Sequence, residues 1–203
     1  KLCKTKVINI NPPSLLKLRI KNKNNTFKKK FQILTVGSLV KAKGVDAIIK
    51  AFKCIKFKNV SLKIIGEGSE RKNLSLLINK LKLKKKVHLI GWANNTEKFY
   101  LESDLFVHAS HQEGFPNSIV EAINYNLPVI ASSCKGGTKE ILLNGKGGDL
   151  FPVNNHKMLS MKINKFFNNM QPLNKKLTLA KKNILKYSMD TNLYKYNKLF
   201  SKV

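Results

Sequence analysis

Apolar segments alternate with helical patterns along this chain and predict a repeated order of strand, loop and helix. Residues 31–36 read as a buried strand closed by Gly37, and apolar side chains then recur at helical spacing from Val45 to Ile55. Further buried strands are predicted at residues 62–65, 87–92, 105–108 and 127–131. Because strands and helices alternate, we expect an α/β fold: a Rossmann-like parallel sheet with helices on both faces.

Helical patterns lie between the predicted strands and also follow the last of them. Helical segments are expected at residues 74–81, 96–101, 155–168, 172–186 and 190–202. The final segment carries one stripe of large apolar side chains, formed by Leu193, Tyr196, Leu199 and Phe200. Near the other end, a short strand at residues 7–11 precedes a basic, asparagine-rich run that we read as a solvated linker.

Two acidic residues, Glu113 and Glu121, flank a predicted helix start and are the first candidates for chemistry. Pro116 lies between them, and proline is tolerated in the first turn of a helix but not in its interior. Glu113 is therefore expected in a loop and Glu121 in the first turn of the helix. The amides of Asn117 and Ser118 should be unpaired there, where the macrodipole is positive and favours an anion.

The same residues also permit a purely structural interpretation. Ser118 and Glu121 have the spacing of a capping box, in which the glutamate bonds the amide of the cap and binds no ligand. Taken alone, this stretch leaves both interpretations open: two carboxylates beside an anion site, or a capped helix.

The loop from Gly37 to Gly44 is the second candidate for chemistry. Gly37 lets the backbone approach a ligand at the end of a strand, and Lys43 lies beside a helix start, where phosphate is favoured. The loop is not a Walker A motif, because it lacks the second glycine before the lysine and no Ser or Thr follows. Because the chain contains many lysines, the residue type alone does not make Lys43 a candidate. Its position beside the helix start does.

The order of these motifs resembles one known family. Glu113 and Glu121 are spaced as Glu-x7-Glu, a strand at 127–131 follows, and a Gly-Gly-x-x-Glu turn then runs from Gly136 to Glu140. This series resembles the donor-binding half of a retaining glycosyltransferase of family 4, whose members have the two-domain GT-B fold. The resemblance covers about residues 32–151.

The length of the chain fits one of the two GT-B domains. Two hundred and three residues leave room for a single Rossmann-like domain, and the chain starts at Lys1 instead of Met. We expect the C-terminal half of a GT-B enzyme, as a fragment or a naturally short chain. Its expected parts are an interdomain linker with a first strand (1–30), a nucleotide-sugar-binding domain (31–170) and C-terminal helices that pack toward the absent N-terminal domain (171–203). Part of the apolar stripe on the last helix should then be exposed.

The resemblance implies a nucleoside-diphosphate sugar as the donor, with UDP favoured, and transfer to a hydroxyl with retention at the anomeric carbon. Lys43 would be catalytic by neutralising the departing diphosphate. Glu113, also catalytic, would hold hydroxyls of the sugar, and Glu121 would bind the ribose. The implied donor-binding residues are Gly37, Ser38, Lys43, Trp92, Glu113, Gly114, Phe115, Asn117, Ser118 and Glu121.

Two of these residues need comment. Ser38 stands where the family's G-R-L-x-x-x-K-G element has an arginine, so one positive charge toward the diphosphate is missing. Trp92, the only tryptophan, follows a strand near the implied position of the nucleotide base, and packing in the core or at its rim is an equal alternative. No cofactor or metal is expected, because no D-x-D pair occurs and His108 and His111 have no evident third ligand.

The implied acceptor is a glycan or a lipid-linked acceptor of the cell envelope, as in lipopolysaccharide assembly, and it would bind the other domain. A hexosyl- or N-acetylhexosaminyltransferase is implied. The residues from Glu113 to Asn117 together with a Cys-x-Gly-Gly turn at Cys134 favour UDP-linked N-acetylhexosamines. The fragment alone would bind donor without transferring sugar.

The net charge of +28 invites other partners, namely nucleic acid or an anionic membrane surface. Arginine, which makes bidentate contacts with phosphate and bases, occurs only as Arg19 and Arg71. Abundant Lys, Asn and Ile instead indicate an A/T-rich coding bias. Three distant cysteines predict neither disulfides nor a metal cluster, and no apolar run is long enough to span a bilayer. We expect a cytoplasmic protein, peripheral at the inner face of the membrane.

Two alternatives to an active enzyme stay open. The first is a catalytically inactive remnant with the same fold, supported by Ser38 and by the missing domain. The second is a basic nucleic-acid-binding protein, which would show steeply salt-dependent binding to DNA or RNA and no response to sugar nucleotides.

Overall fold

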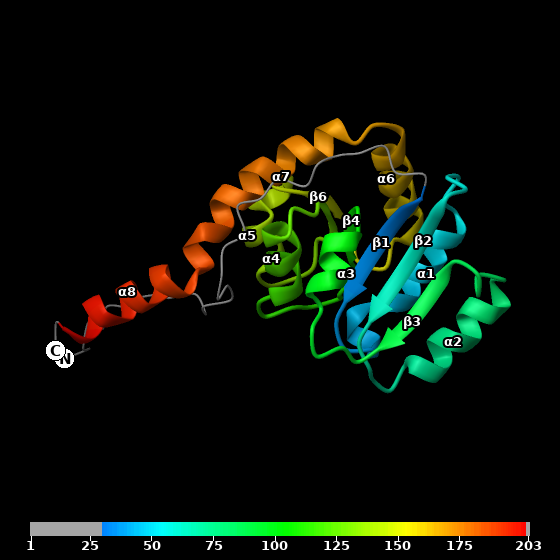
Figure 1. Ribbon diagram of the computed structural model, residues 1–203, viewed down its shortest axis with the longest axis horizontal. Coiled ribbons are helices and arrows are strands. Elements are labelled where there is room, and N and C mark those ends of the chain that lie inside the picture. The colour runs from blue at the N-terminus through cyan, green and yellow to red at the C-terminus, as the bar shows by residue number, and fades with distance from the viewer. Residues whose placement is uncertain (1–29, 202–203) are drawn as a thin grey trace, which may run out of the picture.

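One parallel sheet of six strands lies at the centre of residues 30–201, the part of the chain that the computed structural model describes (Figure 1). The strand order is β3-β2-β1-β4-β5-β6, and every neighbouring pair is parallel. The strands are β1 (Phe31–Val36), β2 (Val60–Ile65), β3 (Val87–Gly91), β4 (Leu105–His108), β5 (Val129–Ser132) and β6 (Asp149–Phe151). The predicted α/β class is confirmed, and the predicted strand at residues 7–11 lies outside the described residues.

Helices cover both faces of this sheet. The α-helices are α1 (Val45–Lys53), α2 (Arg71–Lys80), α3 (Glu97–Glu102), α4 (Asn117–Asn124), α5 (Thr138–Ile141), α6 (His156–Asn168), α7 (Gln171–Ile184) and α8 (Met189–Phe200). Short 3-10 helices are η1 (Lys41–Lys43), η2 (Leu143–Gly145) and η3 (Leu185–Tyr187). The predicted helical segments are therefore confirmed.

The core divides into two hydrophobic clusters, one on each face of the sheet. Consecutive residues of a strand point to opposite faces. In β1, Ile33 accordingly packs in the cluster with α1, α2 and α6, whereas Leu34 packs in the cluster with α3, α4, α5 and α7. Strands buried on both faces read as continuous apolar runs, which is why the sequence pattern located β1, β2, β4 and β5.

β3 is an exception to the predicted burial. The sequence predicts a buried strand here, but β3 lies at the edge of the sheet with β2 as its neighbour. Val87 is buried on the face that carries α2, whereas His88 and Ile90 on the opposite face are exposed, Ile90 by 41%. The prediction of a fully buried strand was wrong because a parallel neighbour and a helix cover only part of an edge strand.

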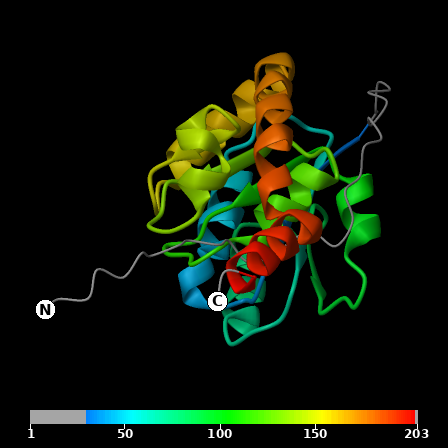
Figure 2. The same cartoon turned by 90° about the vertical axis from the view of Figure 1, so that its left-hand side faces the viewer.

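The C-terminal helices behave differently from one another. α7 packs on α4, and its residues Leu177, Ala180 and Ile184 belong to the core, so the domain extends beyond the predicted boundary at residue 170. Ser188 then adopts extended backbone angles and caps α8, which leaves the body of the domain in a new direction (Figures 1 and 2). The expected exposure of part of its stripe is confirmed, since Phe200 is 69% exposed.

Because all six strands are parallel, their carboxyl ends meet at one edge. The loops that follow β1, β4 and β5 therefore lie side by side at that edge and carry Gly37, Ser110 and Gly136 from distant parts of the sequence, whereas Trp92 follows the outermost strand, β3. This is the edge at which open α/β sheets bind ligands.

Candidate functional site

A cavity of about 330 Å³ lies at the carboxyl ends of β1, β2 and β4. Its volume is at the lower end of the range for small-molecule sites. The cavity brings together eight of the ten predicted site residues, which are Gly37, Ser38, Lys43, Glu113, Phe115, Asn117, Ser118 and Glu121. Trp92 and Gly114 are not among the residues that line it.

The loop that carries Lys43 is held in place by the turn after β2. The amide of Gly37 donates to the carbonyl of Ile65 at 3.0 Å, and the amide of Leu39 donates to the carbonyl of Glu67 at 2.7 Å. Gly66 has φ +136°, and a Cβ atom there would overlap the carbonyl oxygen of Gly37. Glycine at position 66 therefore lets the two loops approach closely and fixes the path toward Lys43.

The loop that carries Glu113 is held in a similar way by the Gly-Gly turn after β5. The amide of Glu113 donates to the carbonyl of Lys135 at 3.1 Å, and the amide of Gly137 donates to the carbonyl of Gly114 at 3.0 Å. Gly136 has φ +106°, and a Cβ atom there would overlap the carbonyl oxygen of Glu113. The Gly-Gly turn, which is part of the family motif, thus has a structural role, because it packs against the Glu113 loop and holds it through backbone hydrogen bonds.

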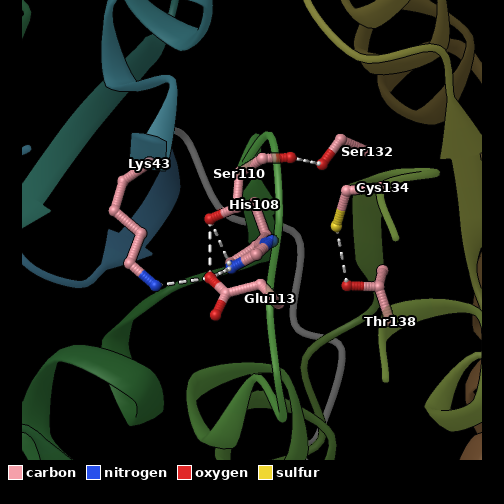
Figure 3. A network of polar contacts seen from close by, with 7 residues as sticks. All are labelled: Lys43, His108, Ser110, Glu113, Ser132, Cys134 and Thr138. Carbon is pink, nitrogen blue, oxygen red and sulfur yellow. Dashed lines mark hydrogen bonds and ion pairs between the residues drawn. The ribbon is translucent and has the colours of Figure 1, made fainter. Parts of the chain in front are cut away.

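Three donors converge on one oxygen of the Glu113 carboxylate, as Figure 3 shows. Its Oε1 accepts from Lys43 Nζ at 2.5 Å and from Ser110 Oγ at 2.7 Å, and His108 Nε2 lies 3.1 Å away. Burial by itself would raise the pKa of Glu113, but the hydrogen bonds from His108, Lys43 and Ser110 outweigh it and lower the pKa to about 2. Glu113 is therefore an anion at any physiological pH.

The other oxygen of Glu113, Oε2, has no hydrogen-bond partner among residues 30–201 and points away from the three donors (Figure 3). The donors themselves are anchored. Ser110 is fully buried, and its carbonyl accepts from Ser132 Oγ at 2.5 Å. The network thus fixes the orientation of the carboxylate of Glu113, which lines the cavity, and leaves Oε2 as an acceptor that these three donors do not occupy.

Glu121, the second carboxylate of the cavity, is held by a hydrogen bond from Tyr100 on α3. The Tyr100 hydroxyl donates to Glu121 Oε2 at 2.7 Å. Burial raises the pKa of Glu121, and the hydrogen bond from Tyr100 only partly opposes this effect. Because Glu121 has no ion pair within the described chain, the two carboxylates of the cavity differ in character: Glu113 stays ionised, and Glu121 takes up a proton more easily.

The helix start differs from the prediction in three respects. α4 begins at Asn117, so Glu121 is its fifth residue and lies beyond the first turn. Ser118 is the second residue of the helix, no side chain caps α4, and the capping-box alternative was wrong. The amide of Asn117, expected to be free, donates to the carbonyl of Phe115 at 3.0 Å, because the chain folds back tightly at Pro116. The amide of Ser118 has no acceptor among the described residues.

Trp92 lies apart from the cavity. Its side chain is 76% exposed, and Nε1 donates to Asn94 Oδ1 at 2.9 Å. The alternative of packing in the core was wrong, because the edge position of β3 leaves the residue after it uncovered. Binding of a base by Trp92 stays a prediction.

Three residues near the carboxylates were missed by the sequence analysis as site residues: Tyr100, His108 and Ser110. His108 and Ser110 lie at and just after the carboxyl end of β4, immediately before Glu113, and that position was the available signal. Tyr100 had no signal, because its contact with Glu121 depends on how α3 packs on α4. Within residues 30–201, no group of three or more His, Cys, Asp or Glu side chains could hold a metal ion.

The fold and the cavity define an α/β protein with a polar site at the carboxyl edge of a parallel sheet. The chain belongs to the family described as glycosyl transferases group 1, whose model matches residues 17–184. An uncharacterised glycosyltransferase of Methanocaldococcus jannaschii is 42% identical over 124 residues, which are 60% of this chain and 30% of that protein.

Two further similarities concern proteins whose names state what they act on or bind. The N-acetylgalactosamine-N,N'-diacetylbacillosaminyl-diphospho-undecaprenol 4-alpha-N-acetylgalactosaminyltransferase of Campylobacter jejuni is 34% identical over 127 residues, 63% of this chain and 34% of that protein. The crystal structure of a Staphylococcus aureus TarM variant with fondaparinux, alpha-GlcNAc-glycerol and UDP is 27% identical, with a TM-score of 0.80 over 92% of this chain and 38% of that one. The superposition confirms the fold expected from the GT-B resemblance.

The chain spans less than half the length of each of these three proteins. Among the described residues, no helix is both long enough and apolar enough to cross a bilayer.

Proposed function

We propose that this chain is the donor-binding half of a retaining glycosyltransferase that transfers a sugar from a UDP-sugar to a hydroxyl of a cell-envelope glycan or lipid-linked acceptor. One observation carries the proposal: Lys43, Glu113 and Glu121, from three separate segments, line a single cavity at the carboxyl edge of the sheet. A cation for a diphosphate and two acceptors for sugar hydroxyls are the groups that a nucleotide sugar requires.

Each side chain has a role in this proposal. Lys43, with the hydroxyl of Ser38 and the free amide of Ser118, neutralises charge that develops on the departing diphosphate. Glu113 accepts hydroxyls of the transferred sugar through Oε2 and so holds the anomeric carbon in place. Glu121 accepts hydroxyls of the ribose. No side chain has to act as a nucleophile, and we propose that no metal takes part, so that EDTA leaves the donor affinity unchanged.

The Lys43 contact with Glu113 adds one requirement. Lys43 Nζ already pairs with Glu113 Oε1, so an incoming diphosphate must share the ammonium group with the carboxylate. An ammonium group has three donor hydrogens and can serve both partners at once. The same contact keeps Lys43 over the cavity when no donor is bound.

The relatives support the donor and the stereochemistry. The Campylobacter relative is named for an alpha-N-acetylgalactosaminyl product, and the TarM crystal contains UDP together with alpha-GlcNAc-glycerol. Because UDP-N-acetylhexosamines have the alpha configuration, an alpha product corresponds to retention. These names favour a UDP-N-acetylhexosamine as the donor of this chain.

The same relative supports a proposal for the acceptor. The Campylobacter relative is named for an undecaprenol-linked acceptor. We propose that the acceptor binds outside the described domain and that the enzyme works at the inner face of a membrane, where the lysine surplus favours anionic lipid. Sedimentation of the chain with vesicles that contain phosphatidylglycerol, but not with phosphatidylcholine vesicles, is the expected result.

A catalytically inactive protein with the same donor site is the second candidate, because Ser38 replaces the arginine of the family element. It would bind UDP and never turn over. Only the net charge supports binding of nucleic acid, and we do not propose that function.

Calorimetric titration of the full 203-residue chain with a panel of sugar nucleotides tests the donor site. Lys43→Ala and Glu121→Ala should each lose most of the affinity for UDP while remaining folded. Lys41→Ala and Glu70→Gln are matched controls, because both residues are near the site but outside the cavity. If no nucleotide binds the wild-type chain, or if the site variants bind as well as the controls, the proposed donor site is wrong.

A further inference from the structure

A buried tyrosine supports the Glu121 carboxylate from behind. Tyr100 is 0% exposed, and its hydroxyl donates to Glu121 Oε2 at 2.7 Å. The ring stacks on Tyr125 with centroids 5.2 Å apart and an interplanar angle of 4°. It also packs beside the ring of Phe106, with the two centroids 5.9 Å apart. The hydroxyl therefore has little freedom to move, and the position of the carboxylate is set by the packing of α3 on α4.

This support determines which oxygen of Glu121 faces a ligand. Oε2 is occupied by Tyr100, whereas Oε1 has no hydrogen-bond partner among residues 30–201. Without the tyrosine hydroxyl, the carboxylate could rotate about its terminal torsion, which is broad and roughly two-fold. A fixed carboxylate accepts a hydroxyl in one geometry only, and this gives directional selectivity that a mobile one lacks.

We propose that Tyr100 is a positioning residue that fixes Glu121 for recognition of the ribose hydroxyls, and so makes the site select ribonucleotides over 2′-deoxyribonucleotides. The inference rests on the proposed function, in which Glu121 accepts the ribose. Tyr100 itself does not line the cavity and touches the nucleotide only through Glu121.

The arrangement of charges around Glu121 explains why such support is needed. The cavity also contains Lys43, Glu113 and His108, but Lys43 is paired with Glu113 and does not reach Glu121 in the described chain. From α3 and α4, Glu121 is faced by Tyr100 and, behind it, Tyr125. Burial raises the pKa of Glu121, no cation among the described residues pairs with it, and the hydrogen bond from Tyr100 is the interaction that opposes this rise.

The pH dependence has a definite direction. Glu121 must be ionised to accept two hydroxyls, so nucleotide binding should be lost as the pH falls through its pKa. Replacing Tyr100 by phenylalanine removes a hydrogen bond that lowers this pKa. The loss should therefore begin at higher pH in the variant than in the wild type. A tyrosine that serves only to fill the core would leave this profile unchanged.

The test is calorimetric titration of the full chain with UDP and 2′-deoxy-UDP from pH 5 to 8. In Tyr100→Phe, we expect the affinity for UDP to fall about 5- to 20-fold and the affinity for 2′-deoxy-UDP to change less than about twofold. Glu121→Gln should lose the same preference for ribose, and the double variant should show no further loss. Tyr125→Phe removes a hydroxyl from the same stacked pair and should keep the preference.

The outcomes separate the inference from the proposed function. If the wild type binds neither nucleotide, the proposed function is wrong and the inference falls with it. If the wild type binds UDP and Tyr100→Phe keeps both the ribose preference and the pH profile, the inference alone is overturned. If Tyr100→Phe does not fold, tyrosine labelled with ¹³C at Cζ decides: the Tyr100 resonance of the wild type should respond to UDP and to ionisation of Glu121, and a resonance that ignores both overturns the inference.

Discussion

Lys43 and Glu113 form an ion pair across the cavity, with Nζ of Lys43 2.5 Å from Oε1 of Glu113, although 70 positions separate them in the chain. Lys43 lies on η1 after β1, and Glu113 lies after β4, the strand next to β1. The pair joins the two loops that would enclose a diphosphate. It also lowers the mobility of a side chain that would otherwise be free in solvent.

Lys43→Met should weaken UDP binding and leave uridine binding unchanged, because uridine has no diphosphate. A hydrogen bond to a charged group contributes about 1.5–3 kcal/mol, so the expected loss is about 10- to 150-fold. Calorimetry with UDP, UMP and uridine measures it, and Lys41→Met, an exposed neighbour outside the cavity, is the control. An equal loss for uridine would show that the variant disturbs the loop and would contradict a direct contact with phosphate.

The ionised Glu113 should stabilise the fold at neutral pH and lose that effect in acid. Its pKa is about 2 in the folded chain against 4.5 for the free group, so the folded state prefers the carboxylate. The contribution is complete above about pH 4.5 and disappears as the pH falls toward 2. After discounting for solvent screening, we expect on the order of 2 kcal/mol.

Urea unfolding at several pH values measures this effect. The difference in unfolding free energy between the wild type and Glu113→Gln should shrink as the pH falls from 5 to 2, because protonated glutamate and glutamine are both neutral. A difference that stays constant over this range would show that Glu113 is not the group whose pKa is lowered.

Gly136→Ala should destabilise the Glu113 loop. The residue has φ +106°, where an L side chain is strained, and the added Cβ would overlap the carbonyl oxygen of Glu113. We expect a loss of about 2–4 kcal/mol in unfolding free energy together with weaker UDP binding. Thermal or urea unfolding measures the first effect.

Gly114→Ala is the matched control for this substitution. No heavy atom lies within 4 Å of the Cβ position of Gly114, so alanine there should change stability by less than about 1 kcal/mol. Equal stability of the two variants would contradict the close packing of the Gly-Gly turn on the loop.

Trp92→Ala tests a predicted site residue whose side chain is exposed and lies outside the cavity. Because its side chain is 76% exposed, truncation should change the unfolding free energy by less than about 0.5 kcal/mol. Stacking of a base on an aromatic ring contributes about 1–3 kcal/mol, so we expect UDP affinity to fall about fivefold or more. Unchanged affinity for UDP would exclude Trp92 from the donor site.

Local patterns in the sequence were enough to locate most elements of the fold and the motifs of the site. Apolar runs located the strands because strands buried on both faces leave few polar positions, and Pro116 located the start of α4 because proline is excluded from helix interiors. The spacing of Glu113 and Glu121 and the glycines at 136 and 137 were visible for the same reason, since each is a local pattern. The family match agrees with the motifs read in this way.

Which side chains contact one another could be seen only in the folded chain. The ion pair of Lys43 and Glu113 depends on β1 and β4 being neighbours, and the bond from Tyr100 to Glu121 depends on α3 packing beside α4. The edge position of β3 and the inclusion of α7 in the core depend on strand order and on helix packing in the same way. Contacts of this kind join residues that are far apart in the chain, and a local pattern contains no information about them.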